Sequence, residues 1–112
     1  MKEKFFNDPE IRCVYNEEED DWYYCVVDIV HVIGLARNPT LYVQQIKNAV
    51  PYLRTNWSLF SKPMVMTDAK GVKRRVTAAN TKFIMRLVME FEAVTSEPYK
   101  LMICSLAYSA LR

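Results

Sequence analysis

The sequence predicts an α+β fold, a single domain of two β-hairpins and about four helices in the order ββαα-ββαα. Two pairs of short segments rich in β-branched and aromatic residues predict the hairpins, and Asn-Pro and Ser-Glu-Pro motifs predict helix starts. The chain has 112 residues, 51% of them apolar and 25% charged, which suits one hydrophobic core and argues against a disordered chain. We therefore expect one domain over residues 1–112, with residues 1–9 as a tail open to disorder.

The first hairpin is expected to join Ile11–Asn16 to Trp22–Val27. Between them lies the acidic run Glu17–Asp21, which is typical of a solvated loop tip. Carboxylates gathered in this way are also the ligands that hard cations prefer, so a metal site is the alternative interpretation of the loop.

Two helices joined by a short turn are expected next. The first should begin at Asp28, whose side chain would cap the free amides that follow, and should end at Gly34. The second begins with Asn38 as N-cap and Pro39 at the first helical position, and Pro51 ends or kinks it near Ala49 or Val50. The pair resembles a helix-turn-helix, which presents its second helix to DNA. The polar face of that second helix carries Thr40, Gln44, Lys47 and Asn48.

The second hairpin and two more helices complete the predicted fold. Lys62–Thr67 and Val72–Thr77 flank a turn in which Gly71 supplies a positive φ. Thr77 is expected to cap the third helix. The last helix should begin around Ser96 and run toward Leu111, apolar on nearly every side, so it is either deeply buried or covered by a dimer partner or a further domain.

The net charge of +2 conceals a division along the chain. Residues 1–34 hold three bases and nine acids, a charge of −6, whereas residues 35–112 hold twelve bases and four acids, a charge of +8. Eight of these bases lie between Arg37 and Arg75 and face one acid, Asp68. Such a segment is expected to present a positive surface to a polyanion, unless the acidic N-terminal part neutralises it.

The basic segment and the polar helix face together give the candidate DNA-binding residues. Glutamine and asparagine side chains can pair with adenine, and lysine and arginine can hold phosphates. The predicted base readers are Thr40, Gln44 and Asn48. The predicted phosphate contacts are Arg37, Lys47, Lys70, Lys73 and Arg75.

No enzyme, cofactor or metal ion is expected. The chain has a single histidine, His31, and no Ser/His/Asp set or Gly-rich phosphate loop. Its three scattered cysteines are expected to be reduced thiols of a cytoplasmic protein, since neither a signal peptide nor a membrane span is visible. The one enzymatic alternative is a metal-dependent nuclease built from Asp20, Asp21 and Asp28.

A series of short motifs follows a fixed order along residues 10–111. The first half has Trp22–Val30, Ile33-Gly34, Asn38-Pro39, Tyr42 and Ile46-Lys47; the second has Asp68, Gly71–Lys73, Thr77, Ala79–Thr81, Arg86-Leu87 and Glu97–Lys100. In this order the motifs resemble the Bro-N domain, the N-terminal module of phage antirepressors and baculovirus Bro proteins. The sequence departs from that pattern by an inserted Ala69, by Ala78 in place of an aspartate and by Met102 in place of a tryptophan.

The resemblance implies an α+β module with DNA-binding capacity that takes part in transcriptional control in a phage, prophage or viral setting. It does not supply DNA-contact residues. The alternative is a protein-interaction module that binds a repressor or another protein through the acidic loop 17–21 and the apolar last helix. A homodimer formed through that helix is compatible with either function.

Overall fold

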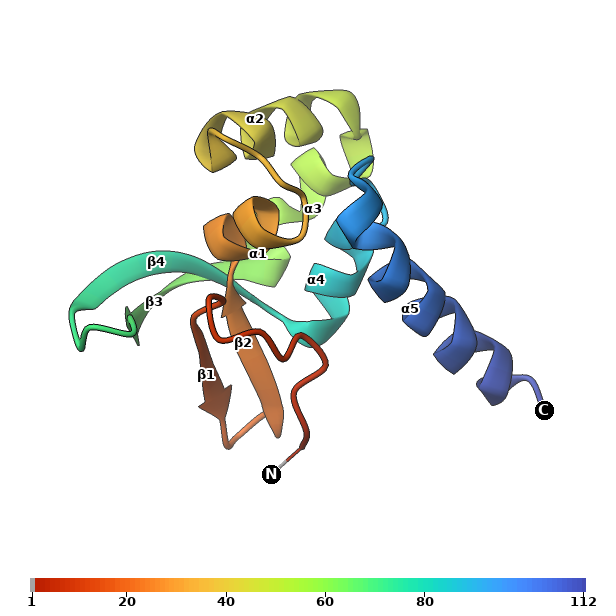
Figure 1. The fold of residues 1–112 in the computed structure, drawn as a ribbon, viewed down its shortest axis with the longest axis horizontal. Coiled ribbons are helices and arrows are strands. Elements are labelled where there is room, and N and C mark those ends of the chain that lie inside the picture. Colours follow the sequence, from red (N-terminus) through yellow and green to blue (C-terminus); the bar gives the residue numbers. More distant parts are fainter. Residues whose placement is uncertain (1) are drawn as a thin grey trace.

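In the described part of the chain, four antiparallel strands form one curled sheet in the order β1-β2-β4-β3 (Figure 1). The computed structural model describes residues 2–112. The strands are β1 (Cys13–Asn16), β2 (Asp21–Cys25), β3 (Ser61–Thr67) and β4 (Lys73–Asn80). Both predicted hairpins are therefore confirmed, and the α+β prediction holds.

Within residues 2–112 the chain also forms five α-helices and one short 3-10 helix. They are α1 (Val26–Val32), α2 (Pro39–Ala49), α3 (Pro51–Phe60), α4 (Thr81–Val88), η1 (Val94–Ser96) and α5 (Glu97–Ala110). None of the helices in the described part of the chain has the length and apolarity needed to cross a membrane.

The sheet buries side chains on both faces because alternate residues of a strand point in opposite directions. Tyr24 and its cross-strand partner Ala79 belong to the main core, which the helices complete. Cys25 and its partner Ala78 point the other way into a second cluster with Met66. The main core thus lies between the sheet and the helices, while the second cluster ties the two hairpins together.

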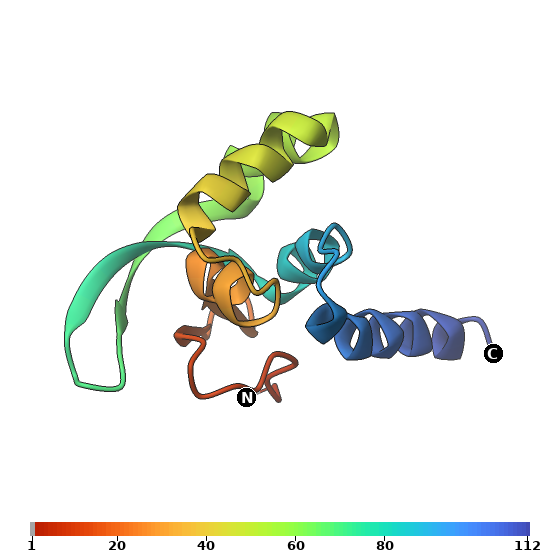
Figure 2. The ribbon, with the colours of Figure 1, turned by 45° about the horizontal axis from the view of Figure 1, so that its top comes forward.

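Strand β4 extends well past β2. Only Ala78–Asn80 pair with β2, whereas Lys73–Thr77 pair with β3 alone. Residues 63–77 therefore form a two-stranded ribbon that projects from the domain, and we call it the β3–β4 arm (Figures 1 and 2). Its turn is closed by Asp68, whose side chain accepts hydrogen bonds from the backbone N–H groups of Lys70 and Val72.

The turn between α1 and α2 differs from the prediction at both ends of α1. Asp28 does not cap the helix, because α1 begins two residues earlier and the Asp28 carboxylate binds Arg12 instead. Leu35, not Gly34, has the left-handed conformation after the helix, with φ of 54°. Gly34 is needed for space: an added Cβ would lie 2.7 Å from the carbonyl oxygen of Val30.

The start and end of α2 are confirmed. The Asn38 side chain accepts a hydrogen bond from the Leu41 N–H at 3.2 Å, and Pro39 follows at the first helical position. Pro51 ends α2 but also occupies the first turn of a new helix, since proline needs no N–H partner there. This helix, α3, is absent from the predicted order.

The prediction that Thr77 caps the third helix is wrong. Thr77 lies within β4, opposite Pro63 of β3, and Asn80 caps α4 by accepting a hydrogen bond from the Phe83 N–H. Pairing with β3 and then β2 keeps the chain extended for three residues beyond the predicted strand end.

The N-terminal segment packs against the first turn of α5. Within the leading segment, Phe6 is 1% exposed and packs against Tyr24 and Tyr99. Beyond this contact α5 leaves the domain (Figures 1 and 2), and among its described residues none is buried. The deeply buried alternative for this helix is therefore wrong.

Candidate nucleic-acid interface

A hollow of about 280 Å³ separates α2 from the base of the β3–β4 arm. Thr40, Gln44 and Lys47 line it from α2 because residues three and four apart share one helix face. Thr77 lines it from β4, and Trp57 lines it from α3. The structure therefore brings three of the predicted α2 residues together with the strand that leads into the arm.

Lys47 is held in place within this hollow. Its Nζ lies 4.9 Å from the centre of the Trp57 ring, which is the geometry of a cation–π contact. Trp57 in turn packs edge-on against Phe83 of the core, with ring centroids 5.5 Å apart. Because the core fixes the indole of Trp57, the contact places the Lys47 ammonium at the edge of the hollow.

One face of the arm continues from the hollow. Along β4, Lys73, Arg75 and Thr77 alternate with Arg74 and Val76, so the first three share a face. Lys73 and Arg75 are both exposed, and Thr77 places their face on the side that α2 lines. The strand register therefore gives β4 two faces.

Two further bases lie on the opposite face of the β3–β4 pair. Arg74 lies on that face together with Lys62, whose cross-strand partner is Ala78. The eight bases between Arg37 and Arg75 are thus divided between two faces of the arm and the helices, and they do not all belong to one continuous surface. The face that adjoins α2 holds Lys73 and Arg75, and Lys70 lies in the turn at the tip.

The acidic N-terminal segment neutralises little of this charge. Within residues 2–112, Lys62 pairs with Glu19 at 3.5 Å, and no ion pair joins Lys70, Lys73 or Arg75 to an acid. Three carboxylates of the acidic loop have other partners: Glu19 and Asp20 accept hydrogen bonds from side chains of the first hairpin, and Asp21 accepts one from Thr81 of α4.

Two of the predicted contacts lie neither in the hollow nor on the β3–β4 arm. Arg37 lines a separate depression with His31 and Glu10, on the side of the α1–α2 turn. Asn48 is exposed on α2 but is not among the residues that line the hollow. As candidate phosphate contacts, Lys47, Lys73 and Arg75 are therefore better placed than Arg37, because they adjoin the hollow or the arm face that continues from it.

Sequence reasoning missed Trp57 and Thr77. The end or kink predicted at Pro51 leaves no separate helix after it, although Leu53 and Trp57 have the i, i+4 spacing of a helix face. Thr77 was missed because it was assigned to a helix cap.

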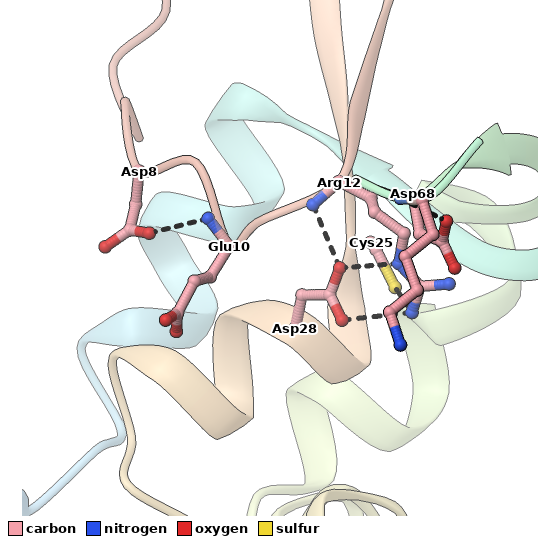
Figure 3. A network of polar contacts seen from close by, with 7 residues as sticks. Asp8, Glu10, Arg12, Cys25, Asp28 and Asp68 are labelled. Carbon is pink, nitrogen blue, oxygen red and sulfur yellow. Dashed lines mark hydrogen bonds and ion pairs between the residues drawn. The ribbon is translucent and has the colours of Figure 1, made fainter. Parts of the chain in front are cut away.

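Asp28 is not free to hold a cation. Figure 3 shows its carboxylate facing Arg12, whose Nε lies 2.8 Å from Oδ2, and the same guanidinium reaches the Cys25 sulfur at 3.4 Å. The Asp28 carboxylate raises the pKa of Arg12, and burial raises the pKa of the Cys25 thiol, so both groups keep their protons. Among residues 2–112 no three His, Cys, Asp or Glu side chains gather as a metal site, and the proposed grouping of Asp20, Asp21 and Asp28 does not form.

The three cysteines of the described chain are unpaired thiols with different surroundings. Cys25 is buried, Cys13 is half-buried and Cys104 is exposed on α5.

Comparisons of the chain with protein-family models, with curated proteins and with solved structures gave no match.

Proposed function

We propose that this chain is a DNA-binding module that holds a duplex between α2 and the β3–β4 arm. One observation carries the proposal: Thr40, Gln44 and Lys47 of α2 share a hollow with Thr77, and the strand face of Thr77 continues as Lys73 and Arg75. Residue types that read base edges and residue types that bind phosphates therefore flank the same opening. The resemblance to Bro-N domains supports a role in an antirepressor-type transcriptional regulator of a phage or prophage.

The dimensions of the two elements suit B-form DNA. An α-helix with its side chains is ~10–12 Å across, which matches a major groove ~12 Å wide. Along the arm, Lys73 is four positions from Thr77, a distance of ~13 Å at ~3.3 Å per residue, and the tip lies farther out. Half a helical turn of DNA is ~17 Å, so the arm spans the distance from a major groove to the neighbouring backbone and minor groove.

The roles of the residues follow from this arrangement. Thr40 and Gln44 face the base edges, while Lys47, Lys70, Lys73 and Arg75 contact phosphates. With about four phosphate contacts, the logarithm of the binding constant should fall with the logarithm of the salt concentration with a slope near −4. A slope near zero, or absence of binding at low salt, would contradict the proposal.

A matched pair of variants tests which face of the arm binds. Lys73→Gln with Arg75→Gln removes two charges from the face that adjoins α2, and Lys62→Gln with Arg74→Gln removes two from the opposite face. The first variant should reduce the salt slope by about 2 and weaken binding to every duplex sequence, because each phosphate contact contributes ~0.9. The second should leave the slope nearly unchanged. Equal effects of both variants would show that the arm acts only through its total charge.

A further inference from the structure

Helix α5 is fixed to the domain only at its start. Tyr99 stacks on Phe6 with ring centroids 5.5 Å apart, and Lys100 Nζ donates a hydrogen bond to the carbonyl oxygen of Phe91. Ile103 is the last partly buried residue, and every described residue after it is exposed. Figures 1 and 2 show the rest of the helix extending away from the other elements.

The projecting part of α5 has the composition of a covered helix. Leu101–Leu111 contains no charged residue. Leu101 is 69% exposed, Leu106 54% and Tyr108 65%. An unsupported helix shorter than ~12–15 residues is marginal in water, and a contiguous exposed apolar patch marks an interaction surface.

A groove of about 690 Å³ follows one side of this helix. The N-terminal segment forms one wall with Phe5, and α5 forms the other. The spacing of the α5 residues by three or four positions makes them one continuous stripe along the helix. The stripe consists of Pro98, Leu101, Met102, Ser105, Leu106 and Ser109.

We infer that this stripe binds the same stripe of a second copy of the chain, with the two α5 helices antiparallel and Ser105 at the two-fold axis. In this register Leu101 lies opposite Ser109 of the second copy, and Met102 lies opposite Tyr108, which borders the stripe. Large residues thus face small ones at Leu101 and Ser109, and the small Ser105 lets the helices approach at the centre. A two-fold axis forms every such contact twice.

The charges at the ends of α5 favour a second copy over an unrelated protein. Glu97 is 64% exposed at the start of the helix, where its carboxylate lies 3.6 Å from Lys100 Nζ on its solvent side, and Arg112 follows the end of the helix. In the antiparallel register Arg112 of each copy lies beside Glu97 of the other, and the opposed helix dipoles also attract. A second copy therefore supplies an uncharged centre and complementary ends with its own sequence. Because the helices are short, we expect the interface to bury less than the ~1,200 Å² at which stable specific interfaces begin, and the dimer should dissociate on dilution.

The oligomeric state tests this inference without reference to DNA. Light scattering or sedimentation over a wide range of protein concentration should show a mass that rises from 13.2 kDa to twice that value. Leu106→Glu should keep the chain monomeric, whereas Leu59→Glu, at a residue 75% exposed on α3, should leave dimerisation unchanged. A chain that is monomeric at every concentration, or two variants that behave alike, would overturn the inference.

Cross-linking tests the register. In a Cys104→Ser background, Ser105→Cys places one thiol of each copy at the two-fold axis, where mild oxidation should give a covalent dimer. Ala107→Cys is the matched control, because two residues turn the helix by ~200° and point the thiol away from the partner. Cross-linking at position 105 but not at 107 supports the antiparallel pair. Equal yields at both positions, or none at 105, would overturn it.

Discussion

Arg12 and Asp28 join the edge of the first hairpin to α1 through three hydrogen bonds. Arg12 Nε lies 2.8 Å from Oδ2, Nη2 lies 3.0 Å from Oδ1, and the Arg12 backbone N–H donates to Oδ2 at 2.9 Å (Figure 3). Both side chains are mostly shielded, with exposed fractions of 21% and 15%. One carboxylate thus fixes both the backbone and the side chain of a residue that precedes β1.

Asp28→Ala should destabilise the fold by about 2–3 kcal/mol, because hydrogen bonds to a charged group are lost and a shielded guanidinium is left without its partner. The melting temperature should fall by about 10 °C for a domain of this size. Glu18→Ala, in the exposed acidic loop, is the control and should shift the melting temperature little. Equal melting temperatures for Asp28→Ala and the parent would show that the contact carries no net stability.

The two glycines should respond differently to substitution. Gly34→Ala would press a Cβ against the Val30 carbonyl oxygen at 2.7 Å, a contact with backbone that cannot move aside, so we expect a loss of about 2 kcal/mol. Gly71→Ala meets no atom within 4 Å but must keep φ of +84°, which should cost about 1 kcal/mol. Gly71→Asn should cost less than Gly71→Ala, because asparagine tolerates this conformation, whereas Gly34→Asn should be worse than Gly34→Ala. Chemical denaturation of the four variants measures these differences.

The sequence predicted the ends of those helices and hairpins that are set by caps and turns formed from neighbouring residues. The Asn38-Pro39 motif fixed the start of α2, and the turn at Gly71 fixed the second hairpin, because caps and turns act over a few residues. The errors came where distant contacts decide. Asp28 was expected to cap α1, but Arg12, sixteen residues away, takes its carboxylate. The C-terminal limit of β4 likewise depends on β2.

The candidate site was predictable in its residue types but not in its grouping. The polar face of α2 follows from helical spacing, and the alternation of Lys73 with Arg74 follows from strand geometry. That Thr77 meets α2 across a hollow, and that Arg37 lies in another depression, depends on how the arm leaves the sheet. Since α3 was missed, its Trp57 beneath Lys47 was not expected.

Phe6→Ala should show that the leading segment is part of the folded domain. The Phe6 ring is 1% exposed and contacts the rings of Tyr24 and Tyr99 at 5.2 and 5.5 Å, so its removal leaves a cavity and should cost about 3–4 kcal/mol. Phe5→Ala, at the partly exposed neighbour, should cost less. Denaturant unfolding of both variants gives the comparison. A small effect of Phe6→Ala would mean that residues 2–9 contribute little to stability.

The stability of the domain should fall in alkaline solution between pH 10 and 12. Burial, followed by the hydrogen bond to Glu19, raises the pKa of Tyr23 from 10.0 to about 12. Because the folded state holds this proton more tightly than the unfolded chain, the stabilisation is complete below pH 10 and is lost as the pH rises to 12. Glu19→Gln removes a negative charge beside the phenol and should lower the pKa of Tyr23, whereas Glu18→Gln should not. Phenolate absorbance during a pH titration measures the shift, and identical curves for the two variants would contradict it.

Trp57 should report directly on DNA contact at the hollow. In a Trp22→Phe background it is the only indole, and it lies beneath the Lys47 ammonium at 4.9 Å. If Lys47 moves to a phosphate on binding, the electric field at the indole changes. Duplex DNA should therefore shift or quench the Trp57 emission over the same concentration range in which fluorescence anisotropy reports binding.

Lys47→Met should reduce the salt slope of DNA binding by about 1, because one phosphate contact is lost. Lys82→Met, at an exposed lysine of α4 outside the hollow, should leave the slope unchanged. Binding with no change in Trp57 emission would place the DNA on another surface and leave α2 without the role assigned to it.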